Sequence, residues 1–111
     1  MDLILEIQSL MKQLETSIKM LRKTGTDYAT AERDYKILLR QECLKLRDSG
    51  TAIGMIDKTC YGIPSVAEAR FKRDVAEATY KANLEAIASI KLQIRILDAQ
   101  VSREWGSNLP T

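Results

Sequence analysis

The sequence predicts an all-α protein: an elongated antiparallel helical hairpin or three-helix bundle that associates with copies of itself. The main observation is the stretch from Pro64 to Trp105, which contains no further proline, no glycine and many strong helix formers. It favours one helix of roughly 60 Å, and other helices must lie along it to bury its apolar residues. The second observation is that two earlier stretches share this helical spacing. We expect one domain over residues 1–106, with helices at about 3–24, 28–48, 52–60 and 65–105, and a flexible tail at 107–111.

The first predicted helix begins after Asp2, whose side chain can cap it, and ends at Gly25. Its apolar residues recur every three or four positions and form a broad stripe: Leu3, Ile4, Ile7, Leu10, Met11, Leu14, Ile18 and Leu21. A stripe of this width is typical of a helix that faces a core. It also makes the helix a candidate for contact between chains.

The second predicted helix starts after a cap at Thr26 or Asp27 and is terminated by Gly50. Its inner face consists of Ala31, Tyr35, Leu38, Leu39, Cys43 and Leu46. The outer face carries several arginines and lysines, but acids are interleaved with them and no aromatic platform accompanies them. This pattern favours a solvated surface over a phosphate-binding one.

A short helix is predicted between the longer ones, capped by Thr51 and stopped by Gly62. The arrangement matches helix-turn-helix spacing, which gives four candidate anion or nucleic-acid contacts: Lys58, Arg70, Lys72 and Arg73. A recognition helix usually presents several polar side chains, whereas this one is mostly small or apolar. We therefore favour an elbow that reverses the chain and closes one end of the bundle.

The start of the long C-terminal helix is marked by Pro64, whose fixed φ is compatible with a helix, by Ser65, which can cap it, and by Glu68, which can complete a capping box. Its seam follows coiled-coil spacing through Val66, Ala69, Ala76, Tyr80, Ile87, Ile90, Ile94, Leu97 and Val101. A second apolar row, Leu84, Ala88, Leu92 and Ile96, drifts away from the first. One neighbour cannot cover both rows, so we expect contact with at least two helices, some of them from another copy.

These patterns give a set of candidate helix-packing or oligomer-interface residues: Ile7, Leu14, Tyr80, Leu84, Ile87, Ile94, Leu97, Val101 and Trp105. Trp105, the sole tryptophan, either caps the bundle end or forms a contact surface. Arg73 and Asn83 interrupt the seam. Facing a partner helix, Arg73 would need an acid such as Asp57 or Glu42, which we favour, or an anionic ligand.

One alternative concerns residues 90–96, which alternate apolar and polar side chains as a half-buried strand does. A strand would need a break before it and a second strand to pair with, and the sequence offers neither. The helix is therefore favoured.

Composition narrows the function further. Seventeen basic and fifteen acidic residues leave a net charge of +2, which gives no argument for nucleic acid or an acidic membrane. The chain has no histidine, so its two cysteines cannot complete a zinc site or a Cys-His catalytic pair. We expect both cysteines to be reduced thiols, with Cys43 buried, in a cytoplasmic protein without metal, cofactor or membrane span. No enzymatic activity is expected.

Three runs resemble a group of small helical proteins of bacteriophages and prophages of Gram-positive bacteria. They are residues 52–58 (AIGMIDK), residues 69–82 (ARFKRDVAEATYKA) and residues 94–106, which end in Arg-Glu-Trp-Gly. The resemblance covers about the last two thirds of the chain. It implies a phage origin and a bacterial host cytoplasm, and it transfers no site residue.

The resulting expectation is a non-enzymatic, self-associating interaction protein that binds a host or phage protein. Its role would be that of a replication or recombination accessory, or of an inhibitor of a host defence. The alternative is a helix-turn-helix-like nucleic-acid-binding protein, whose binding would weaken steeply with salt.

Overall fold

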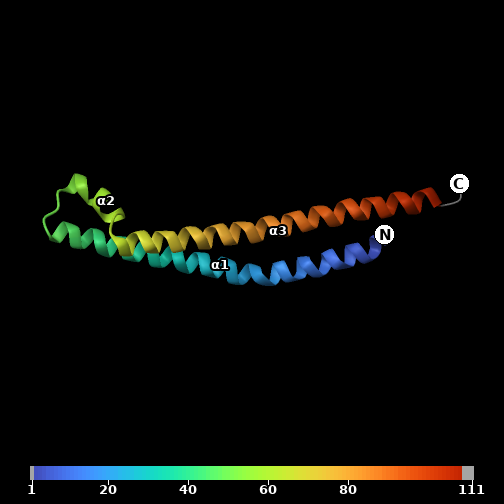
Figure 1. Cartoon of the computed structure of the whole chain (residues 1–111), viewed down its shortest axis with the longest axis horizontal. Coiled ribbons are helices and arrows are strands. Elements are labelled where there is room, and N and C mark those ends of the chain that lie inside the picture. Colours follow the sequence, from blue (N-terminus) through green and yellow to red (C-terminus); the bar gives the residue numbers. More distant parts are fainter. Residues whose placement is uncertain (1, 109–111) are drawn as a thin grey trace. The chain divides into compact units, whose positions relative to one another are not determined.

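The protein is all-α throughout residues 2–108, the part that the computed structural model describes (Figure 1). Helix α1 spans Leu3–Asp48, α2 spans Ile53–Tyr61 and α3 spans Pro64–Asn108. The all-α prediction is confirmed. The strand alternative for residues 90–96 is wrong, because these residues lie within α3 and no strand occurs in the described part of the chain.

Helix α1 does not stop at Gly25. The predicted end there and the new start near residue 28 are wrong, because α1 is one helix of 46 residues. A single glycine inside a helix costs only about 1 kcal/mol relative to alanine, and apolar spacing continues on both sides of it. Gly25 instead allows a close approach: a Cβ at this position would lie 3.3 Å from Cε1 of Tyr80.

The two ends of α1 follow the sequence signals. Asp2 caps the start, because its Oδ1 accepts a hydrogen bond of 2.9 Å from the backbone N–H of Ile4. At the other end Gly50 adopts a left-handed φ of 87°. The N–H of Gly50 donates to the carbonyl of Arg47 and the N–H of Thr51 to that of Leu46, each at 3.1 Å. This is a Schellman motif, and it confirms Gly50 as the terminator.

Three other predicted helix ends need correction. Ala52, not Thr51, precedes α2, and it makes no side-chain capping bond, because an alanine side chain has no hydrogen-bonding atom. The residue Pro64 is itself the first of α3, so Ser65 lies inside the first turn instead of capping it. At its other end α3 continues to Asn108, beyond the predicted 105. Residues 109–111 of the predicted tail lie outside the described residues.

The chain forms two compact units. Of the described residues, the first unit contains 2–23 and 81–108, and the second contains 24–80. In the first unit α1 and α3 pack antiparallel around the buried side chains of Leu10, Ile87 and Ile90. The polar interruption Asn83 is satisfied there, because its Nδ2 donates to the backbone carbonyl of Ser17 at 2.9 Å.

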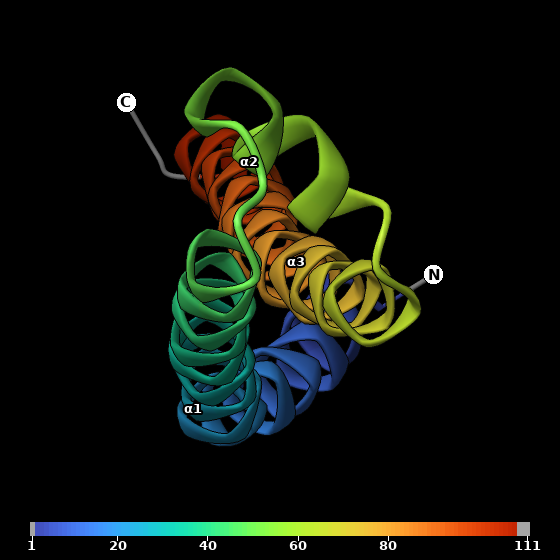
Figure 2. The same ribbon diagram turned by 90° about the vertical axis from the view of Figure 1, so that its left-hand side faces the viewer.

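In the second unit α2 folds back against the parts of α1 and α3 that flank it (Figure 2). Cys60 of α2 is fully buried with Val66 and packs against Tyr35, which is 6% exposed. The partly buried residues around this cluster are Leu38, Leu39, Cys43, Leu46, Ile63 and Ala69. The short helix therefore forms the elbow that the sequence predicts, and the predicted inner face packs in this core from Tyr35 to Leu46, whereas Ala31 lines a groove described below.

Candidate interaction surfaces

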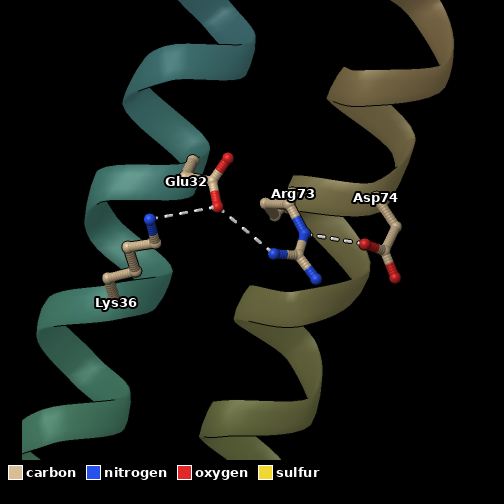
Figure 3. Close-up of polar contacts among 4 residues, drawn as sticks. All are labelled: Glu32, Lys36, Arg73 and Asp74. Carbon is tan, nitrogen blue, oxygen red and sulfur yellow. Dashed lines mark hydrogen bonds and ion pairs between the residues drawn. The ribbon is translucent and has the colours of Figure 1, made fainter.

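Arg73 links α3 to α1 within the second unit (Figure 3). Its Nη1 donates to Oε1 of Glu32 at 3.4 Å, and its Nε donates to Oδ1 of the adjacent Asp74 at 2.7 Å. Glu32 also pairs with Lys36, whose Nζ lies 3.6 Å from the same carboxylate oxygen. The Arg73 guanidinium carbon lies 4.7 Å from the centre of the Tyr35 ring. Acids and an aromatic ring of the chain itself therefore surround this arginine.

The prediction that Arg73 meets an internal acid is confirmed, but the predicted acids, Asp57 and Glu42, are wrong. The partner is Glu32, because the uninterrupted α1 lies antiparallel to α3 and brings residue 32 opposite residue 73. The hydrogen bond to Asp74 and the nearby acids raise the pKa of Arg73. The pKa of Glu32 is lowered, first by a hydrogen bond with Tyr28 and then by the charges of Lys36 and Arg73.

The four predicted anion or nucleic-acid contacts do not share one surface. Lys58 is exposed on α2, and the guanidinium of Arg70 lies 5.6 Å from the centre of the Tyr61 ring. Lys72 lines a groove described below, and Arg73 pairs with Glu32. Lys72 points to a different side of α3 from Arg70 and Arg73, since successive helix positions are about 100° apart, and Arg73 already contacts acids of the chain itself. The structure therefore does not assemble a cationic platform from them.

The two cysteines lie close together, and the one that is buried is not the one that the sequence predicts. Cys60 is fully buried and its Sγ lies 3.6 Å from the carbonyl oxygen of Leu39, whereas Cys43 is only half-buried. The prediction that Cys43 is the buried thiol is therefore wrong, because α2 folds back and inserts Cys60 into the core. Burial, followed by a hydrogen bond with Cys43, raises the pKa of Cys60 to about 11. Both cysteines are free thiols.

Most of the predicted helix-packing or interface residues contribute to packing within the chain. Ile87 is buried, while Ile7, Leu14, Tyr80, Ile94, Leu97 and Val101 are half-buried. Two residues of the set are exposed: Leu84 at 39% and Trp105 at 65%. The second row predicted on α3 is exposed as well, with Leu92 at 52% and Ile96 at 55%.

One side of the first unit carries an exposed apolar face. Ile4, Met11 and Ile18 recur every seven residues along α1 and are each about half exposed. Met11 also lines a shallow depression of about 320 Å³, together with Leu14 of α1 and Ile94 of α3. The only charged residues that line this depression are Lys91 and Arg95. Leu84 lies seven residues before Lys91 and so on the same side of α3. We call these six apolar residues the apolar face: Ile4, Met11, Leu14, Ile18, Leu84 and Ile94.

The second unit carries a groove of different character between α1 and α3. Its volume is about 520 Å³, and its lining residues are Asp27, Thr30, Ala31, Asp34, Leu38, Ser65, Glu68, Ala69 and Lys72. Three of these are acids and one is a lysine. A second hollow of about 310 Å³ continues it and shares Asp27 and Lys72. We call the two together the acidic groove.

Within the described residues, apolar side chains are exposed more often than they are buried. Six hydrophobic residues are buried, whereas sixteen large ones are more than a third exposed. Scattered exposed apolar residues are normal on a soluble protein, but a set aligned on one side of a helix pair indicates a contact surface. Among the described residues, none of the helices has the continuous hydrophobic stretch that a membrane-spanning segment requires.

The sequence signals missed several of these residues. The sequence pattern leaves Glu32 among the acids of the outer face, although its spacing from Tyr28 and Tyr35 places it beside the inner face. The acids of the groove also have a recognisable spacing, because Asp27 and Asp34 are seven residues apart and flank Ala31. Only the structure shows that Glu68 and Lys72 of α3 lie opposite them.

Comparisons with known proteins find no relative: no family model matches the sequence, and neither curated proteins nor solved structures show significant similarity.

Proposed function

We propose that this chain is a non-enzymatic helical interaction protein of phage or prophage origin that binds proteins through the apolar face of its first unit. These proteins are other copies of the chain and a host or phage protein that acts in replication, recombination or defence. The phage origin is supported by the resemblance of residues 52–58, 69–82 and 94–106.

The observation that carries the proposal is the alignment of half-exposed apolar residues along one side of α1. Met11 is 52% exposed and Ile18 is 48% exposed, and both are on the side where the depression between α1 and α3 opens. A helix pair buries only the sides that face each other, so each outer apolar row gains about 25 cal/mol for every Å² that a partner removes from water. This geometry therefore supports binding to another helical surface as the function.

The test uses two matched double variants of α1. Met11→Glu with Ile18→Glu places two charges on the apolar face, whereas Leu5→Glu with Met20→Glu changes two equally exposed apolar residues on another side of the same helix. Tagged protein of each kind is used to capture untagged wild-type protein, and proteins from a bacterial host lysate.

We expect the first variant to lose the capture of both, and the second to behave as wild type. Circular dichroism must show equal helix content in all three proteins. Equal capture by both variants would contradict the proposal, because the apolar face would then make no contribution to binding.

A further inference from the structure

The acidic groove has the length and lining of a surface that receives helices. On α1 it runs from Thr24 to Leu38, and on α3 from Ser65 to Thr79, which is roughly 20 Å on each helix at 1.5 Å per residue. Its floor contains small side chains such as Ala31, over which another helix can approach to an interaxial distance of about 8–10 Å.

The charges of the groove define what fits it. Three carboxylates, those of Asp27, Asp34 and Glu68, line it together with the single cation of Lys72, and beside the groove Asp34 also pairs with the exposed Arg33 at 3.0 Å. An apolar surface bordered by cations would bury the floor while its charges meet the carboxylates. The acidic rim discriminates against a partner that carries acids of its own.

The chain itself carries a surface of this description. The depression on the apolar face is lined by Met11, Leu14 and Ile94, with Lys91 and Arg95 as its only charged residues. Neither cation makes an ion pair with another of the described residues. The lining of this depression thus has two positive charges, and the lining of the first hollow of the groove has a net two negative charges.

We propose that the acidic groove of one copy receives the apolar face of another copy, with Lys91 and Arg95 opposite Asp34 and Glu68. This inference rests on the proposed function and names the surface to which the apolar face binds. Two antiparallel helix pairs stacked in this way form a four-helix contact with a shared apolar core, which neither pair forms alone. The contact joins two different surfaces, and each copy supplies both.

Charge reversal tests this arrangement. In one variant Lys91→Glu and Arg95→Glu make the apolar face acidic, and in the other Asp34→Lys and Glu68→Lys make the groove basic. Each variant alone then carries a face and a groove of like charge and should associate at least about tenfold more weakly than wild type. When the two variants are mixed, every face again meets a groove of opposite charge.

Sedimentation velocity on the separate variants and on their equimolar mixture supplies the readout. We expect each variant alone to sediment as a single copy and the mixture to regain the wild-type distribution, less so as salt is raised. A control with Arg40→Glu and Arg47→Glu reverses two exposed cations elsewhere on α1 and should associate as wild type. Helix content by circular dichroism shows that each variant is folded.

The pattern of results separates this inference from the proposed function. If the groove variant associates as wild type while the face variant does not, the face binds some other surface and the inference is wrong, while the proposed function stands. A mixture that does not associate also overturns the inference, as does a wild-type protein that sediments as one copy. Failure of the proposed function is detected separately, by unchanged capture with the Met11→Glu, Ile18→Glu variant.

Discussion

Alanine at Gly25 should stabilise the protein much less than alanine at Gly54, although both glycines lie in helices. Replacing glycine by alanine inside a helix gains up to about 1 kcal/mol. At Gly54, in the first turn of α2, a Cβ would meet no atom within 4 Å, so nothing opposes this gain and the melting temperature rises by up to roughly 4 °C. At Gly25 the new Cβ would lie 3.3 Å from Cε1 of Tyr80, which is closer than most van der Waals contacts, and 3.7 Å from Cδ1, which is an ordinary contact.

The Tyr80 ring cannot retreat without cost, because its centre lies 5.9 Å from that of the Tyr28 ring, a contact worth about 0.5–1.5 kcal/mol. The loss offsets the gain in helix propensity, so Gly25→Ala should change the free energy of unfolding by close to zero. In a Tyr80→Ala background the new methyl group meets no ring, and the same substitution should stabilise by about 1 kcal/mol.

The assay is a double-mutant cycle, measured by urea unfolding with circular dichroism at one fixed protein concentration. The expected coupling between positions 25 and 80 is about 1 kcal/mol, which exceeds the error for additive sites. If Gly25→Ala stabilises both backgrounds equally, the ring does not lie against this glycine and the close approach is refuted.

Three further predictions concern the core and the pH dependence of stability. Val66→Ala should cost about 2 kcal/mol, because it removes two fully buried methyl groups, whereas Val75→Ala, at a half-exposed site, should cost less than about 0.5 kcal/mol in urea unfolding. The pKa of Glu32 is lowered in the folded protein, so this carboxylate contributes stability that is present above its unfolded pKa of 4.5 and lost as pH falls through its folded pKa. In the Glu32→Gln variant, the free energy of unfolding should therefore fall less steeply as the pH is lowered below 4.5. The pKa of Cys60 is raised from 9.0 to about 11, so the buried thiol contributes stability that is present below pH 9 and lost as pH rises to 11. This loss is roughly 2–3 kcal/mol. When unfolding is measured at pH 8.5 and 11, the Cys60→Ala variant should not show this part of the decrease in stability.

The sequence predicts the helical elements of this fold well where the signals are local. Gly50 and Gly62 end helices, Pro64 begins one, and the spacing of apolar residues identifies the inner face of residues 31–46. Gly25 could not be assigned in the same way. A glycine that ends a helix and a glycine that admits an aromatic ring from a distant segment have the same local signature, and only the ring position distinguishes them.

Features that depend on how distant segments align were the least predictable. The seam pattern placed Arg73 opposite a partner helix, but the choice of Glu32 depends on where α1 ends and on how long the elbow is. The burial of Cys60 instead of Cys43 has the same cause, since it requires α2 to fold back onto α1. The acidic groove needs both helices in register, so residues such as Asp34 and Glu68 could not be grouped from spacing alone.

The central claim is that the first unit exposes an apolar face that another protein surface covers. Sedimentation equilibrium of the purified wild-type chain at tens of micromolar tests it most directly, with the Met11→Glu, Ile18→Glu variant measured alongside. We predict that the wild type has a mass above the 12.5 kDa of one copy and that the variant returns to 12.5 kDa while keeping its helix content. A mass of 12.5 kDa for both proteins at every concentration would contradict self-association through this face.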